Sequence, residues 1–114
     1  MLRLVVLISG AGSNLLSLLE ACEGDGFPAE VVAVGADRDA SGLVHAQKYG
    51  IPTFVVDWTR YPDRESWGDA LLERMRQWTP DLVVHSGFMR IVPARVVAAF
   101  TPRMINTHPA YLPE

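Results

Sequence analysis

The chain has 114 residues, 49% hydrophobic and 20% charged, which suits one globular domain and excludes extended disorder. Its formal net charge of −3 gives no bulk electrostatic reason to expect nucleic acid or an anionic membrane as partner. The single cysteine, Cys22, excludes an intrachain disulfide, and the apolar run near the start is too short to span a membrane, so we expect a cytoplasmic protein.

Apolar, β-branched runs alternate with helix-like segments along the chain. In order, the sequence predicts a strand at 2–9, a helix at 13–22, a strand at 30–37, a helix at 42–50, a strand at 53–57, a helix at 63–78, a strand at 81–87, a helix at 93–100 and a strand at 103–108. Strands without polar alternation are typical of parallel sheets covered on both faces. We therefore expect one α/β domain over 1–114, with a Rossmann-like, doubly wound, mostly parallel sheet flanked by helices. Ligands bind such sheets beyond the carboxyl ends of the strands.

A glycine loop, SGAGSN, follows the first predicted strand and opens the first helix. Its glycines allow a tight turn close to a ligand, and the start of the helix favours an anion. Gly10 and Gly12 match the dinucleotide-binding pattern G-x-G-x-x-G, but Leu15 stands at the third position. Because Ser13 and Asn14 add hydrogen-bonding side chains, we interpret the loop as a site for a single phosphate. The alternative is a plain turn in which Ser13 caps the helix without a ligand.

Other polar residues near the strand ends carry weaker signals. The aspartates of ADRD (36–39) could bind a ribose hydroxyl, but solvated acidic residues after a second strand are equally common. His85 lies inside a predicted strand and is expected to be a core histidine with satisfied hydrogen bonds. Arg64, at the start of the third helix, is by default a solvated surface residue.

The segment GFMRI leaves the fourth predicted strand with a glycine, large apolar side chains and an arginine. Phe88, Met89 and Ile91 could line an apolar slot for a flat aromatic ligand. They could equally cap the core, and the sequence does not separate the two interpretations.

Asn106 and His108 lie two residues apart at the end of the last predicted strand, so their side chains share a face. The amide can donate to a developing oxyanion, and the imidazole can deliver a proton near neutral pH. These are groups that acyl transfer requires. The alternative is that Asn106 starts a turn and His108 packs on Pro109. A metal site is not indicated, because the three histidines lack ligand spacing.

The segments LISGAGSN, GFMRI and INTHPAYLP occur together, and the combination resembles the phosphoribosylglycinamide formyltransferase family of folate-dependent formyl transferases. The resemblance runs from residue 4 to residue 113. It implies formyl transfer from 10-formyltetrahydrofolate, as co-substrate, to the amine of phosphoribosylglycinamide in purine biosynthesis. It implies no metal, no nucleic acid and no membrane partner, and it leaves a homodimer open.

The resemblance also implies roles for individual positions. The residues matching those that hold the substrate phosphate are Gly12, Ser13 and Asn14. The residues matching those that bind folate are Arg64, Met89, Arg90, Ile91, Val92 and Asn106. Asn106 and His108 match two of three catalytic residues: both would stabilise the oxyanion formed when the amine attacks the formyl carbon, and His108 would return a proton to the leaving folate nitrogen.

Family members continue beyond the position of Glu114, and the resemblance implies that their continuation supplies the catalytic aspartate. We therefore expect a C-terminally incomplete sheet, and little or no activity from the 114-residue chain alone, with a partial phosphate site retained. Two alternatives remain: a hydrolase that deformylates formyltetrahydrofolate, against which the phosphate loop argues, and a noncatalytic nucleotide-binding module, against which Leu15 argues.

Overall fold

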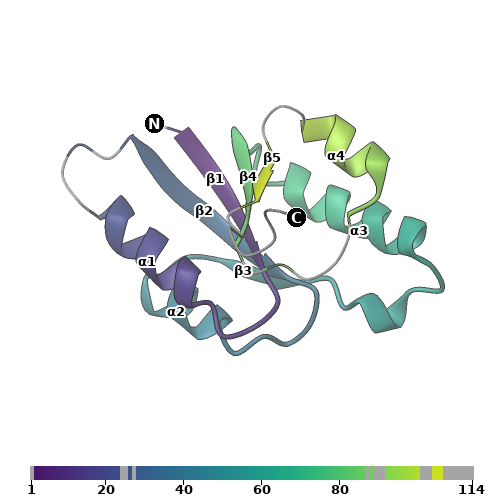
Figure 1. Cartoon of the computed structure of the whole chain (residues 1–114), viewed down its shortest axis with the longest axis horizontal. Helices are drawn as coiled ribbons and strands as arrows, with labels where there is room; N and C mark the ends of the chain where they lie inside the picture. The colour runs from purple at the N-terminus through teal and green to yellow at the C-terminus, as the bar shows by residue number, and fades with distance from the viewer. Residues whose placement is uncertain are drawn as a thin grey trace, which may run out of the picture.

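The computed structural model describes residues 2–23, 26, 28–86, 88, 92–100 and 104–106 (Figure 1). Its strands are β1 (Leu2–Ile8), β2 (Ala29–Ala36), β3 (Thr53–Val55), β4 (Leu82–His85) and β5 (Met104–Asn106). Its helices are α1 (Ser13–Cys22), α2 (Leu43–Lys48), α3 (Arg64–Arg76) and α4 (Ala94–Phe100), with a 3₁₀ helix η1 (Trp58–Arg60). Every predicted strand and helix is confirmed, with ends that differ by a few residues.

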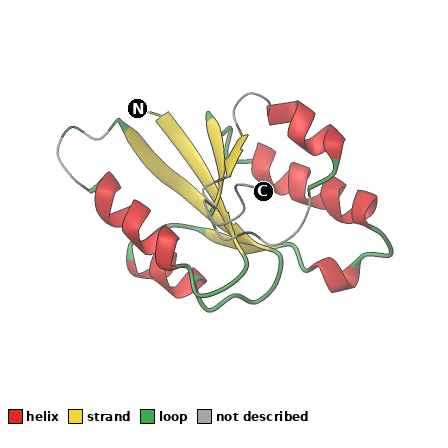
Figure 2. Cartoon of the chain, viewed as in Figure 1, coloured by secondary structure: helices red, strands yellow, loops and turns green. Residues whose placement is uncertain are grey.

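The strands form one five-stranded parallel sheet in the order β3-β2-β1-β4-β5. The chain builds outward from β1 to β3 and then crosses back to place β4 on the other side of β1. The order therefore reverses between β1 and β4, as in Rossmann-like folds, and the predicted fold class is confirmed. The loops after β1, β2 and β3 gather at one end of the sheet (Figure 2).

Helices cover both faces of the sheet: α1 and α2 lie on one face, and α3 and α4 on the other (Figure 1). Alternate residues of β1 point to opposite faces, as the strand period requires. Those packed among α1 and α2 are Leu4, Val6 and Ile8. Those packed among α3 and α4 are Val5 and Leu7. The apolar run of β1 is thus explained, because both faces of this strand are buried under helices.

A register shift in β2 preserves this burial. Leu4 pairs with Val31, but the next residue, Val5, pairs with Ala33, so Val32 is the extra residue of a bulge. A bulge reverses the alternation of side chains. Val31 and Val34 consequently both pack among α1 and α2, although they lie three residues apart.

The sequence reading missed η1. Asp57 precedes this short helix, and its carboxylate accepts hydrogen bonds from the backbone N–H of Thr59 at 3.0 Å and the Thr59 hydroxyl at 2.7 Å. These two bonds lower the pKa of the Asp57 carboxyl. The sequence signal that could have predicted this turn is the Asp-x-Thr spacing of Asp57 and Thr59.

Arg3 ties the end of α3 to the start of β1. Its guanidinium donates from Nη2 to the carbonyl of Trp78 at 2.7 Å and from Nε to that of Thr79 at 3.3 Å. Its backbone N–H donates to Oδ2 of Asp81 at 2.8 Å. Trp78 and Thr79 lie just beyond the C-cap residue of α3, Gln77, so Arg3 holds the turn between α3 and β4 against β1.

Replacing Arg3 with methionine keeps an apolar stem but removes these donors. We expect the free energy of unfolding to fall by about 1–2 kcal/mol, measured by urea denaturation followed by circular dichroism. Arg60→Met is the matched control, because the Arg60 side chain is 81% exposed and its nitrogen lies 3.8 Å from Asp57. That control should change stability by less than about 0.5 kcal/mol. Equal losses in the two variants would contradict the role given to Arg3.

Candidate functional site

The glycine loop lies at the carboxyl end of β1, beside the point where strand order reverses. Gly12 is the N-cap residue of α1 and has a left-handed backbone, with φ of 73°. Ser13 is already helical, so the prediction that Ser13 caps the helix is wrong, whereas a turn without a ligand stays an alternative. Within the described residues no side chain caps α1, and its first turn contains no acidic residue. The exposed N–H groups of this turn therefore suit an anion.

Leu15 explains why the third glycine of the dinucleotide pattern is replaced. Its side chain is fully buried in the cluster formed by β1, β2, α1 and α2. The space that a glycine would leave for close helix–strand packing is filled here by an apolar side chain.

Gly42 and His45 fix the conformation of the glycine loop. The N–H of Gly42 donates to the carbonyl of Gly10 at 2.9 Å, and Nε2 of His45 lies 3.1 Å from the carbonyl oxygen of Ala11. The contact at Gly42 is so close that a Cβ there would lie 2.7 Å from the Gly10 oxygen. Sequence reasoning missed both residues, because Gly42 looked only like the start of a short helix.

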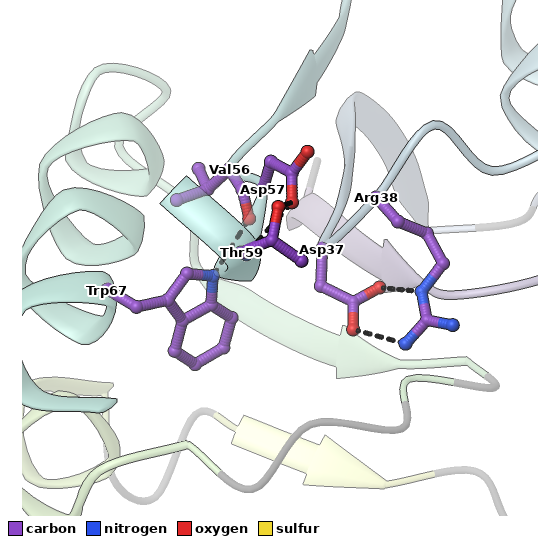
Figure 3. A network of polar contacts seen from close by, with 6 residues as sticks. All are labelled: Asp37, Arg38, Val56, Asp57, Thr59 and Trp67. Carbon is purple, nitrogen blue, oxygen red and sulfur yellow. Dashed lines mark hydrogen bonds and ion pairs between the residues drawn. The ribbon is translucent and has the colours of Figure 1, made fainter. Parts of the chain in front are cut away.

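Asp37 and Arg38 follow β2 and form a bidentate ion pair (Figure 3). Nε and Nη2 of Arg38 donate to the two carboxylate oxygens of Asp37, each at 3.1 Å. Asp37 is completely buried, and its carboxylate raises the pKa of the Arg38 guanidinium. Asp37 thus presents no exposed oxygen to a ribose hydroxyl, whereas Asp39 remains exposed.

Arg64 is exposed at the start of α3 and lines a pocket of about 410 Å³. The residues around this pocket are Trp58, Thr59, Tyr61, Pro62, Asp63, Arg64 and Trp67. Asp63 caps α3 by accepting a hydrogen bond from the N–H of Ser66 at 2.7 Å, which fixes where the helix starts and hence where Arg64 lies. The sequence placed Arg64 on the surface, and the structure confirms this and adds the aromatic surroundings.

The exit of β4 is joined to that pocket through stacked aromatic rings. Phe88 is buried and stacks on Trp67 with centroids 6.0 Å apart, and it meets the half-buried ring of His85 edge-on at 5.5 Å. Of the two interpretations of Phe88, the structure supports the one that caps the core. Val92 is buried in the same cluster. Met89, Arg90 and Ile91 lie outside the described residues.

Asn106 ends β5, where its backbone pairs with His85 of β4, which in turn pairs with Leu7 of β1. The carboxyl ends of β1, β4 and β5 therefore lie side by side. The backbone of Asn106 and the glycine loop are consequently at the same end of the sheet, the end where these strands finish. The side chain of Asn106 and the whole of His108 lie outside what the structure describes.

The described part of the chain contains no group of three His, Cys, Asp or Glu side chains placed to hold a metal ion. Among the helices of that same part, none is long and apolar enough to cross a membrane.

Comparisons with known proteins agree on one family. Residues 2–114 match the family model described as formyl transferase. The phosphoribosylglycinamide formyltransferase of Mycobacterium tuberculosis (strain H37Rv) is 47% identical over 97% of this chain and 51% of its own length. That of Escherichia coli K12 is 37% identical over 99% of this chain and 54% of its own length. The chain thus spans about half the length of the curated relatives it matches.

Solved structures give the same result. The phosphoribosylglycinamide formyltransferase of Brucella melitensis superposes with a TM-score of 0.93 and 39% identity, covering 98% of this chain and 59% of the other. The enzyme from Coxiella burnetii, solved in complex with CHES, superposes with a TM-score of 0.92 and 38% identity. That match covers 99% of this chain and 54% of the other.

Proposed function

The chain belongs to the formyl transferase family, and from that premise we propose that it carries the phosphate-binding half and the start of the catalytic segment of a phosphoribosylglycinamide formyltransferase. The reaction would transfer a formyl group from 10-formyltetrahydrofolate to the amine of phosphoribosylglycinamide in purine biosynthesis. Residues 1–114 would form one α/β domain in this enzyme.

The glycine loop is the observation that carries the proposal. Gly12, Ser13 and Asn14 form the start of α1 at the switch point of the sheet. The helix has no acidic residue in its first turn, and no side chain in the described part of the chain caps it. A phosphate monoester would receive hydrogen bonds from the backbone N–H groups of this turn and benefit from the helix dipole. Leu15 leaves the loop unlike that of a dinucleotide site, which favours a single phosphate.

The chemical step is assigned to Asn106 and His108. In the backbone register, Asn106 lies at the carboxyl end of the strands, as the glycine loop does, and this supports the assignment. The substrate amine would attack the formyl carbon, and the Asn106 amide and the His108 imidazole would stabilise the resulting oxyanion. The attacking amine would give up a proton, and protonated His108 would return one to the departing folate nitrogen as the oxyanion collapses to the new formamide carbonyl and the old C–N bond breaks.

Folate would occupy the side of the site formed by the β4 exit and the start of α3. The residues assigned to it are Arg64, Met89, Arg90, Ile91, Val92 and Asn106. Arg64 supports this placement because it is exposed and lies in a pocket with aromatic walls. Trp67, in the wall of that pocket, stacks on Phe88 and so connects it with the β4 exit.

Replacing Gly12 with alanine tests the phosphate assignment. Its φ of 73° is unfavourable for alanine by about 1–2 kcal/mol, and the added Cβ would lie 3.1 Å from Cα of Gly42. We expect the affinity for phosphoribosylglycinamide, measured by isothermal titration calorimetry, to fall about tenfold or more. In the unsubstituted protein, the ligand should shift the NMR signals of the Gly12, Ser13 and Asn14 amides.

Gly50→Ala is the matched control, because Gly50 has φ of 71° and a Cβ there meets nothing within 4 Å. It should cost similar stability but leave the affinity unchanged. Ribose 5-phosphate should compete with the ligand, and NAD should not. Tight NAD binding would favour the nucleotide-binding module, and hydrolysis of formyltetrahydrofolate without phosphoribosylglycinamide binding would favour the deformylase.

A further inference from the structure

His45, on α2, contacts the glycine loop across a long stretch of chain. Its Nε2 lies 3.1 Å from the carbonyl oxygen of Ala11. A carbonyl oxygen only accepts hydrogen bonds, so Nε2 carries the proton and donates it. The ring also approaches Gly12: its Cδ2 lies 3.4 Å from the position that a Cβ of Gly12 would occupy. One residue before Ala11, the carbonyl of Gly10 accepts a hydrogen bond from the N–H of Gly42 at 2.9 Å.

These two hydrogen bonds determine where the loop N–H groups point. In a trans peptide the C=O of one residue and the N–H of the next point in opposite directions within one plane. With the Ala11 carbonyl directed at His45, the N–H of Gly12 is directed away from α2. With the Gly10 carbonyl directed at Gly42, the N–H of Ala11 is also directed away from it. Successive N–H groups that point outward beside a left-handed residue form an anion-binding concavity.

We propose that His45 is a positioning residue of the phosphate site. It orients the Ala11–Gly12 peptide so that the N–H of Gly12 is aimed at a bound phosphate monoester. This inference rests on the proposed function, since it assigns a new residue to the same site. His45 touches the loop from the side of α2, and its action on the ligand passes through the backbone.

Three substitutions at His45 distinguish the effect of its hydrogen bond to Ala11 from the effect of its size. In His45→Gln the amide nitrogen stands the same number of bonds from Cα as Nε2 of histidine, so it can donate to the Ala11 carbonyl. His45→Leu keeps a side chain of similar size without a donor, and His45→Asn keeps an amide that is one bond too short. We expect the affinity for phosphoribosylglycinamide to fall about tenfold in the leucine and asparagine variants. The glutamine variant should stay within about threefold of the unsubstituted protein.

The NMR signal of the Gly12 amide provides the second measurement. Ligand should shift it in the unsubstituted protein and in His45→Gln, and much less in His45→Leu and His45→Asn. Gln47→Leu, on the exposed side of the same helix, is the control and should bind normally. If the unsubstituted protein binds and His45→Leu binds equally tightly, the inference is wrong and the proposed function stands. If the unsubstituted protein does not bind phosphoribosylglycinamide, the proposed function fails and the inference fails with it.

Discussion

Substituting Gly42 with alanine should abolish most of the affinity for phosphoribosylglycinamide. The new Cβ would lie 2.7 Å from the Gly10 oxygen and 2.8 Å from the carbonyl carbon and oxygen of Ala11. These are backbone atoms of the glycine loop, so relief requires the loop to move and its N–H groups to turn. We expect at least about a tenfold loss of affinity by calorimetry, together with about 1–3 kcal/mol of lost stability from overpacking.

Gly35→Ala is the control that separates loss of stability from loss of the site. A Cβ at Gly35 would lie 2.3 Å from the ring of Phe54, on the face of the sheet covered by α3 and α4. It should therefore destabilise the core while the folded protein keeps its affinity for the ligand. A Gly42→Ala variant that binds like the unsubstituted protein would show that the loop does not depend on its packing against α2.

The sequence predicted the fold because the information lies in short stretches of chain. Apolar runs such as that of β1 have no polar alternation, and burial between helices on both faces removes them from water. Short connections then allow only right-handed crossovers, which restricts the topology. The presence of the glycine loop could also be predicted, because Gly10 and Gly12 directly follow an apolar strand and precede a helix.

Two of the parts that sequence reasoning missed depend on residues far apart in the chain. His45 and Ala11 lie 34 residues apart, and nothing in either segment alone indicates that they meet. The same holds for Gly42, whose lack of a side chain matters only because the Gly10 carbonyl lies against it. The burial of Asp37 was missed for a different reason: its ion-pair partner is the adjacent Arg38, but a fully buried carboxylate and a solvated loop residue look alike in sequence.

Replacing Trp67 with alanine should give the largest loss of stability. The Trp67 side chain is only 2% exposed, stacks on Phe88 and donates from its indole nitrogen to the carbonyl of Val56 at 2.8 Å (Figure 3). Removing a buried aromatic ring leaves a cavity and an unpaired carbonyl, at a cost of about 3–5 kcal/mol. Because a domain is stable by only about 5–15 kcal/mol, urea denaturation followed by circular dichroism should show a much earlier transition.

Two further variants show which property of Trp67 matters. Trp67→Phe keeps a ring against Phe88 but removes the donor to Val56, so its loss should be intermediate, about 1–3 kcal/mol. Trp58→Ala removes an indole from the same pocket, but the Trp58 side chain is 39% exposed, so the loss should be smaller than for Trp67→Ala. Equal losses at the two tryptophans would contradict the view that Trp67 belongs to the core. If Trp67→Ala costs more stability than Trp58→Ala, Trp67 is the residue that attaches the wall of the Arg64 pocket to the core. Trp58 is then a residue of the same wall that can be replaced without unfolding the protein.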